Sequence, residues 1–206
     1  MARKTKEQAE ATKEAILEAA INVFYKEGVS KATLEKIAAE AGVTRGAVYW
    51  HFKNKADIFA VLHEQLCVPF ADMVLENLEK NHTQPLEQLI EITTELLLDL
   101  EHDERKRSVL TIFFLKCEYS GEMEPFLAFQ QEEKLKHRKL FSRYFEVAAK
   151  KGHLPKGADP DMLANAFVSY FTGIVFEYLR DPKMFKLKKQ AEALIRVFFE
   201  GAAVKK

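Results

Sequence analysis

The chain has 206 residues, and its 31 basic and 31 acidic side chains give no net charge. This balance excludes a protein that is drawn to nucleic acid by its overall charge, and two cysteines are too few for a disulfide framework. Residues 1–55 nevertheless carry a net charge of +3, so the positive charge is concentrated at the amino-terminal end.

Glycine and proline are sparse, at 8 and 6 residues, and no stretch alternates strictly between apolar and polar residues. We therefore predict an all-α protein of about nine helices. In chain order they cover residues 7–26, 34–41, 44–52, 55–78, 85–100, a stretch reaching Cys117, 125–151, 160–179 and 187–200. Pro69 lies inside the fourth helix, where it removes one hydrogen bond and favours a bend.

The stretch from Thr33 to Lys55 predicts a helix-turn-helix. Leu34, Ile37 and Ala38 repeat at helical spacing, and the following Gly42 suits the left-handed residue that ends a helix. Thr44 is placed to cap a second short helix. In this motif the start of the second helix enters the major groove, where an arginine binds guanine edges, so Arg45 is the best candidate for base recognition.

The segments LEKIAAEAG and GVTRGAVYWHFKNK, together with the preceding helix and FLKCEYSGEM at residues 114–123, resemble the TetR family of repressors. Within the family they are most similar to the AcrR/TtgR branch, which controls multidrug efflux pumps. The resemblance implies a helix-turn-helix DNA-binding domain over residues 1–54. It also implies a ligand-binding and dimerisation domain over 55–206, with the helix at 55–78 connecting the two.

The resemblance also implies a role for each residue near the DNA. Thr44, Arg45 and Ala47 would face the bases, while Gly46 lets the backbone come close to them. Contacts to phosphates or to the DNA backbone would come from Thr33, Lys36, Tyr49, Trp50, His51 and Lys55.

Apolar and aromatic stripes in the later helices are ordinary core by default. The family resemblance implies an effector cavity among these helices, for a small hydrophobic ligand that is cationic or aromatic. The predicted lining residues are Leu66, Phe70, Leu89, Ile92, Thr93, Leu96, Leu110, Phe114, His137, Phe141, Tyr144, Phe145 and Phe171.

The last two helices carry more apolar circumference than one protomer's core needs. Two such helices from each chain can form a four-helix bundle, as they do in the family, so we expect a homodimer. The predicted interface residues are Phe167, Ile174, Leu194, Val197 and Phe198. A two-fold dimer presents two recognition helices to a palindromic operator in double-stranded DNA.

Three other hypotheses compete with an efflux repressor. The chain could regulate another circuit, such as fatty-acid or aromatic catabolism, or act as an activator. Glu79 with His82, and Asp99 with His102, have the carboxylate–histidine spacing of helical di-iron enzymes. Cys117 could sense redox state, although its phenylalanine neighbours favour an inert thiol, and we expect both it and Cys67 to be reduced.

We predict no catalytic site, cofactor or metal. The amino terminus lacks the apolar segment of a signal peptide, and the apolar stretch from Phe167 to Leu179 is short for a membrane span. A cytoplasmic protein with no membrane partner is therefore expected. The sequence leaves open the effector, the operator, the regulated genes and the number of dimers on each operator.

Overall fold

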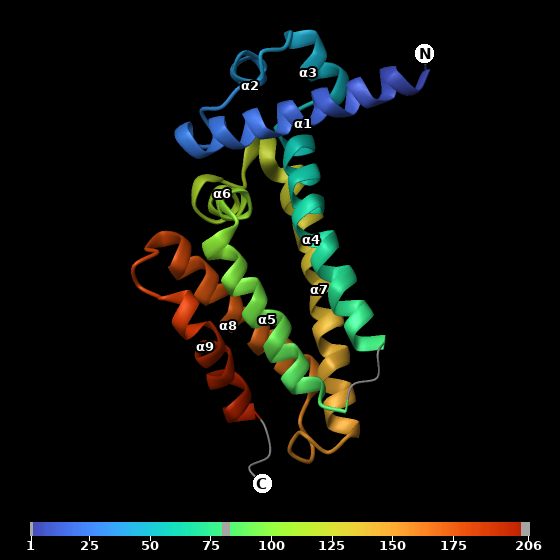
Figure 1. The fold of residues 1–206 in the computed structure, drawn as a ribbon, viewed down its shortest axis with the longest axis vertical. Coiled ribbons are helices and arrows are strands. Elements are labelled where there is room, and N and C mark those ends of the chain that lie inside the picture. Colours follow the sequence, from blue (N-terminus) through green and yellow to red (C-terminus); the bar gives the residue numbers. More distant parts are fainter. Residues whose placement is uncertain (1, 80–82, 203–206) are drawn as a thin grey trace. The chain divides into compact units, whose positions relative to one another are not determined.

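The computed structural model describes residues 2–79 and 83–202, and these residues form helices and loops without any β-strand (Figure 1). The all-α prediction is confirmed. The chain divides into two compact units. The first contains Met1–Leu66 and Ser108–Gln130, and the second contains Cys67–Arg107 and Gln131–Lys206.

The first unit is built on α1 (Ala2–Glu27), α2 (Leu34–Glu40), α3 (Arg45–His51) and the beginning of α4 (Lys55–Glu79). The first helix thus begins five residues earlier than predicted. Its apolar stripe packs against the inward faces of the next three helices. The fully buried side chains of this core include Ile16, Leu17, Phe24, Ile37, Val48, Ile58 and Phe59.

Residues 108–130 belong to this first unit, whereas the sequence analysis ended the DNA-binding domain at residue 54. Phe113 and Phe126 are buried there, and their rings lie 5.2 and 5.3 Å from the ring of Phe59 on α4. A three-helix unit of about 50 residues buries too little apolar surface to be comfortably stable. The inserted segment enlarges its core.

The predicted sixth helix is interrupted. Helix α6 (Glu104–Thr111) continues as a π-helical turn, η1 (Ile112–Lys116), and Cys117 lies in the extended segment before a 3₁₀ turn, η2 (Gly121–Met123). Phe113 continues the buried row of Val109 and Ile112 and is 5% exposed, while Phe114 lies beside that row and is 37% exposed.

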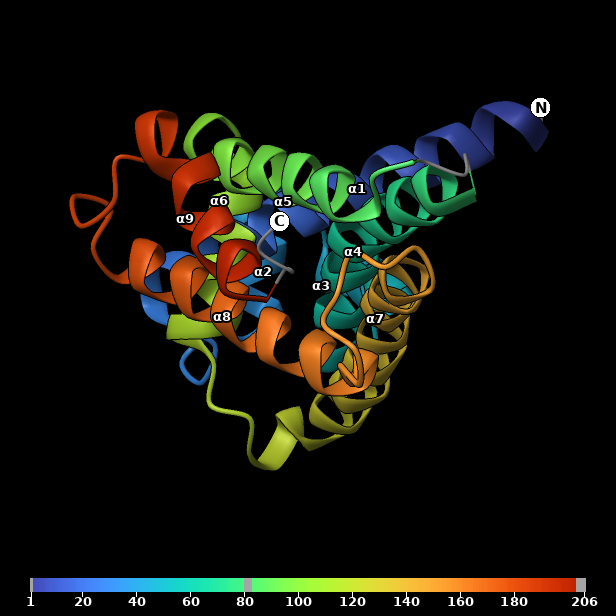
Figure 2. The ribbon, with the colours of Figure 1, turned by 90° about the horizontal axis from the view of Figure 1, so that it is seen from below.

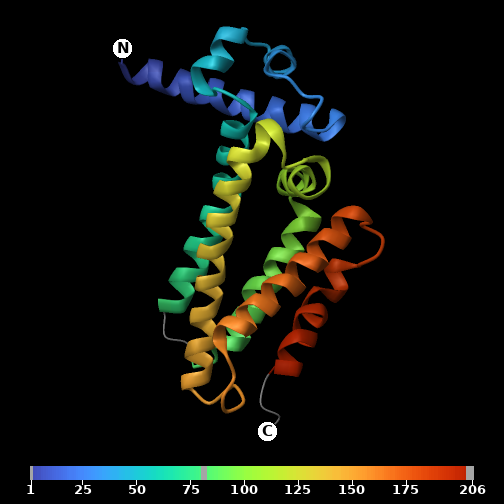
Figure 3. The same ribbon diagram turned by 180° about the vertical axis from the view of Figure 1, so that it is seen from behind.

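The second unit contains α5 (Pro85–His102), most of α7 (Glu124–Lys150), α8 (Pro160–Arg180) and α9 (Leu187–Ala202). Helix α9 lies along α5 (Figure 2), where Arg196 donates to both carboxylate oxygens of Glu87 at 3.2 and 2.9 Å. Helix α8 contacts α9 on another side (Figure 3). An aromatic cluster around the buried Phe167 joins α7, α8 and α9.

Two helices connect or complete these units and are unusually apolar. Helix α4 contains Pro69 and passes from the first unit to the second between Leu66 and Cys67. Its residues Lys55–Glu76, and Pro160–Arg180 of α8, are long and apolar enough to cross a membrane by length and composition alone. Core helices of soluble proteins pass the same test, so this finding is weak evidence for a membrane span.

Candidate functional site

The helix-turn-helix is held by two threonine caps. The hydroxyl of Thr33 accepts from the backbone amide of Lys36, and that of Thr44 accepts from the amide of Ala47, both at 3.2 Å. Each hydroxyl satisfies an amide that the first turn of a helix leaves unpaired. The caps fix where α2 and α3 begin.

The turn between the two helices depends on Gly42, whose φ of 65° is left-handed. The amides of Gly42 and Val43 donate back to the carbonyls of Ala39 and Ala38 at 3.2 and 3.0 Å. Helix α2 therefore ends sharply, and only three residues separate its last residue, Glu40, from Thr44. The predicted cap and turn chemistry is present.

Helix α3 has one buried and one exposed face. Val48 is fully buried, and Phe52, which ends the helix, is 2% exposed. On the other face Tyr49 is 44% exposed and Trp50 is 73% exposed. Large exposed aromatic side chains on so short a helix contribute little to the core, which favours a role in binding.

Arg45 lies on the exposed face at the start of α3. Its guanidinium forms an ion pair with Glu35 of α2 at 3.0 Å and stands 5.2 Å from the centre of the Tyr49 ring. The Tyr49 hydroxyl also lies 3.4 Å from the guanidinium and, with Glu35, raises the pKa of Arg45. These exposed contacts are weak, so DNA can compete for the guanidinium.

Nothing in the fold demands glycine at position 46. A methyl group added there would meet its nearest neighbour, the Thr44 hydroxyl oxygen, at 3.9 Å, which is ordinary contact. Gly46 is exposed and Ala47 is half-buried beside it. The smooth, small surface agrees with a close approach of DNA to the start of α3.

His51 is half-buried at the end of α3, and its ring meets that of Trp50 edge-on at 4.5 Å. Burial, followed by repulsion from Lys13, lowers the pKa of His51 below 6.5. The imidazole is therefore mostly neutral at pH 7. In that form it can offer a phosphate one N–H donor but little positive charge.

The two flanking candidates on α2 are also exposed. Thr33 uses its hydroxyl oxygen in the cap, and its hydroxyl hydrogen already bonds the Glu35 carboxylate, so a phosphate would have to compete for it. The Lys36 ammonium is paired with Glu27 at 2.6 Å and lies 3.3 Å from the carbonyl of Lys31. A phosphate contact by Lys36 would have to replace the exposed ion pair.

Lys55 was predicted to contact phosphate, but it does not lie on this exposed surface. The residue is 7% exposed, and its ammonium donates to the carbonyls of Val29 and Ala32 at 3.0 and 3.1 Å. Glu122 completes its environment at 3.0 Å. Lys55 was predicted to bind phosphate because it follows the helix-turn-helix directly. Its ammonium is instead bound by three oxygen acceptors within the first unit.

The predicted effector-lining residues are distributed over both units. Leu66, Leu110 and Phe114 belong to the first unit, and the others belong to the second. Phe114 is 37% exposed and does not lie on the inward row of Val109, Ile112 and Phe113. Phe70 lies on α4, but its side chain is outside the described part of the structure.

Within the second unit, the predicted lining residues that are buried are Leu89, Ile92, Thr93, Phe141, Tyr144 and Phe145. Leu96, His137 and Phe171 are half-buried, as are Leu66 and Leu110 in the first unit. Burial lowers the pKa of His137, so its ring is also mostly neutral at pH 7.

Two of the predicted polar lining groups already have partners in the protein. The Thr93 hydroxyl donates to the Leu89 carbonyl at 2.7 Å, and the Tyr144 hydroxyl donates to the Val74 carbonyl at 3.0 Å. Burial raises the pKa of Tyr144 to about 12, so its hydroxyl stays protonated. These groups stabilise the unit before any ligand arrives.

Gln88 is a polar residue that the sequence analysis missed. It lies on the buried side of α5 at 6% exposure, and its amide nitrogen has no hydrogen-bond partner among the described residues. An unsatisfied buried donor is costly and calls for an explanation. A polar residue inside the apolar pattern PLEQLIEI was the available signal.

Two of the predicted interface residues are core residues of a single protomer. Phe167 is fully buried, and Ile174 is 6% exposed. Leu194 and Phe198 are half-buried, and Val197 is 64% exposed on α9. The aromatic ring of Phe198 lies 5.2 Å from that of Phe167, which draws it toward the core.

The alternative chemistries find limited support. Among residues 2–79 and 83–202 no group of three or more His, Cys, Asp or Glu side chains is placed to hold a metal. Asp99 is paired with Lys106 at 2.5 Å, and His102 is exposed, while His82 lies outside the described residues. Burial raises the pKa of Cys67 to about 12 and that of Cys117 to about 11, which disfavours reactive thiolates.

Comparison with known proteins agrees with this geometry. Residues 16–62 match the model for bacterial regulatory proteins of the tetR family, and residues 84–202 match the carboxy-terminal region of MAATS-type transcriptional repressors. The transcriptional regulator AcrR of Shigella flexneri is 34% identical over 200 residues, which cover 97% of this chain and 93% of that protein.

Solved structures extend the similarity to the whole fold. NalD, a secondary repressor of the MexAB-OprM multidrug efflux pump in Pseudomonas aeruginosa, is 34% identical with a TM-score of 0.89, covering 97% of this chain and all of that one. The complex of SmeT with triclosan is 31% identical with a TM-score of 0.85, covering 95% and 93%. SmeT is the repressor of the Stenotrophomonas maltophilia efflux pump SmeDEF.

Both halves of the chain, the capped helix-turn-helix and the helical unit that follows it, are therefore accounted for by one group of proteins. The chain belongs to the TetR family of bacterial transcriptional regulators.

Proposed function

We propose that this protein is a cytoplasmic repressor that binds a palindromic operator as a homodimer and is released by a hydrophobic effector. The exposed face of α3 carries the proposal, because Arg45, Tyr49 and Trp50 stand on a surface with no packing role. Relatives that repress multidrug efflux pumps favour an efflux operon as the target.

Base recognition would begin at the amino-terminal turn of α3. Arg45 would leave Glu35 and bind a guanine, with Thr44 and Ala47 beside it and Gly46 allowing close approach. Tyr49, Trp50, His51, Thr33 and Lys36 would contact the backbone and fix the register. In a dimer the two recognition helices would meet successive major grooves, about 34–36 Å apart.

An aromatic ligand would fit the second unit, whose interior is rich in phenylalanine. The unpartnered amide of Gln88 would donate to an acceptor atom on that ligand. The SmeT–triclosan complex supports an aromatic ligand. Binding would lower operator affinity only through different affinities for two conformations, typically by about 1–3 kcal/mol.

Fluorescence anisotropy with labelled DNA from upstream of the gene tests the proposal. We expect tight, sequence-selective binding that hydrophobic cations or planar phenols release. Selective binding that no compound releases would contradict the effector and leave the DNA-binding role intact. Binding that is weak and unselective at two salt concentrations would contradict the operator assignment.

The dimer requires a separate test. Val197 is a large exposed apolar residue of α9, so Val197→Asp should give monomers in sedimentation without loss of helix content. Lys189→Gln, also exposed on α9, is a control that changes the charge by the same amount and sign. A Val197→Asp variant that remains fully dimeric would place the interface on other residues.

A further inference from the structure

All three N–H donors of the Lys55 ammonium have an oxygen partner within the first unit. An ammonium has three N–H groups, and here three oxygens lie at 3.0–3.1 Å: the carbonyls of Val29 and Ala32 and a carboxylate oxygen of Glu122. The side chain is only 9% exposed, so the geometry is set inside the first unit. Lys55 thus joins three segments that are far apart in sequence.

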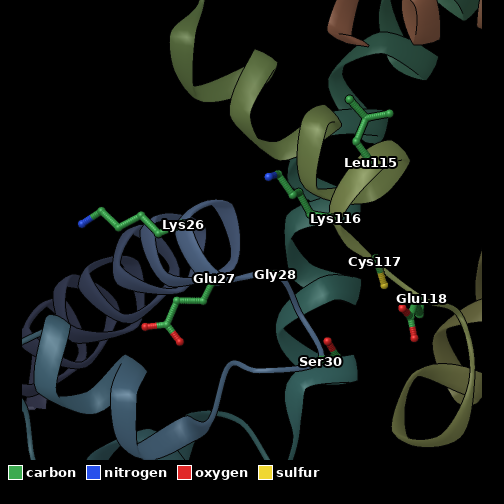
Figure 4. Close-up of a pocket in the computed structure, with 8 residues that line it drawn as sticks. All are labelled: Lys26, Glu27, Gly28, Ser30, Leu115, Lys116, Cys117 and Glu118. Atoms are coloured by element: carbon green, nitrogen blue, oxygen red, sulfur yellow. The ribbon is translucent and has the colours of Figure 1, made fainter.

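A second contact links two of the same segments. The amide of Val29 donates to the carbonyl of Lys116 at 3.1 Å. Lys26, Glu27, Gly28 and Ser30 of one segment and residues 115–118 of the other line a pocket of about 280 Å³. Figure 4 shows these eight residues. Gly28 turns the chain there with a φ of 81°, which other residues rarely adopt.

The path of the chain shows which parts of the protein these contacts connect. Residues 108–130 belong to the first unit, but the chain enters them from the second unit at Arg107 and returns to it at Gln131. Residues 28–33 lead directly to the Thr33 cap of α2. The contacts at Lys55 therefore join the inserted segment to the loop that precedes the DNA-binding helices.

We propose that Lys55 and Glu122 form a positioning junction that keeps α2 and α3 in their operator-binding arrangement and transmits effector binding to them. The effector part of this proposal rests on the proposed function, whereas the positioning part does not. Lys55 acts through the fold and not on a phosphate. The partner carboxylate cancels its charge, so it adds little attraction for DNA.

The first test changes only the carboxylate. Glu122→Gln weakens the ion pair, and Glu118→Gln removes the same charge from an exposed position in the same segment. Electrostatics alone predicts equal or tighter DNA binding for both variants. The junction instead predicts that Glu122→Gln weakens operator binding by at least about threefold while Glu118→Gln does not. Equal behaviour of the two variants would overturn the positioning role.

The second test asks whether Lys55 touches DNA. A residue that neutralises one phosphate lowers the slope of log affinity against log salt by about one when it is removed. We expect Lys55→Met to weaken operator binding with an unchanged slope. A slope that falls by about one would identify Lys55 as a phosphate ligand and overturn the junction. Circular dichroism of the same samples checks that the variants are folded. If Lys55→Met does not fold, the Glu122→Gln test still decides the positioning role.

The third test addresses transmission. For the full-length protein we compare operator affinity with and without saturating triclosan or another compound that releases the wild type. The junction predicts that the ratio of the two affinities is at least about threefold smaller in Glu122→Gln than in the wild type, and unchanged in Glu118→Gln. A ratio in Glu122→Gln equal to that of the wild type would overturn transmission. If no compound releases the wild type, the proposed effector response fails, and the first two tests still decide the positioning role.

Discussion

Arg45 at the start of α3 and Lys55 at the start of α4 are ten residues apart, and the fold uses their charges in opposite ways. The Arg45 side chain is 65% exposed and has one exposed ion pair and an aromatic neighbour. The Lys55 side chain is 9% exposed and has three oxygen acceptors within the first unit. A basic residue near a DNA-binding motif is therefore not by itself a DNA contact.

The difference comes from the backbone around each residue. Helix α3 sends Arg45 away from Val48, into solvent, where a guanidinium is available for a guanine edge. Near Lys55, the loop at 29–32 leaves two carbonyls outside any helix, and a buried carbonyl needs a donor. Lys55 supplies that donor. Four experiments test this comparison.

The largest effect is expected on the buried side of the motif. Phe52→Ala should lower the free energy of unfolding by about 3–5 kcal/mol, because it leaves a cavity at a residue that is 2% exposed. Trp50→Ala, at a residue 73% exposed, should change it by less than about 0.5 kcal/mol. Urea unfolding measures both. Equal losses would mean that Trp50 also supports the core.

Removing the Lys55 ammonium should affect stability more than removing a neighbouring surface charge. Lys55→Met leaves the Val29 and Ala32 carbonyls without their donor and should cost about 1–3 kcal/mol. Lys53→Met removes an exposed lysine and should cost less than about 0.5 kcal/mol. The comparison fails if both variants unfold at the same urea concentration as the wild type.

Arg45 should show the reverse pattern. Arg45→Ala should leave the unfolding curve nearly unchanged, weaken operator binding by about 1–3 kcal/mol and relax the preference at one base pair. Arg143→Ala, an exposed arginine of the second unit, is the control. Competition anisotropy with single-base operator variants measures the preference. Undiminished affinity and selectivity would place base recognition elsewhere.

The smallest effect concerns acid. Because burial lowers the pKa of His51 below 6.5, the unfolded chain binds a proton at a higher pH than the folded one. Stability present above pH 6.5 is therefore lost as the pH falls through the folded-state pKa. Thermal midpoints at pH 8 and pH 5 should fall further apart in the wild type than in His51→Gln. An identical pH dependence would show that His51 does not contribute.

The helix-turn-helix was predictable because its signals are local. Thr33, Gly42 and Thr44 act within four residues of their own positions, and the spacing of Leu34, Ile37 and Val48 defines the buried faces directly. The exposure of Arg45, Tyr49 and Trp50 follows from the same helical periodicity. These parts of the site were predicted residue by residue.

The other errors share a physical origin. Phe114 was assigned to an inward stripe together with Phe113, but Val109, Ile112 and Phe113 form the buried row and Phe114 lies beside it. Phe167 and Ile174 were assigned to a dimer interface because both cores and interfaces select apolar side chains. An apolar pattern predicts that a side chain is buried, but it does not say whether the protomer's own core or a partner chain covers it.

The sequence by itself determined the all-α class, the caps and turn of the DNA-binding motif, and the side chains that α3 presents to solvent. Those features depend on backbone conformation and periodicity within a few residues. Only the tertiary structure brought residues 108–130 into the first unit and placed Glu122 beside Lys55. It also left the buried amide nitrogen of Gln88 with no hydrogen-bond partner among the residues that the structure describes. Such contacts join positions tens of residues apart, and they depend on how the helices pack together.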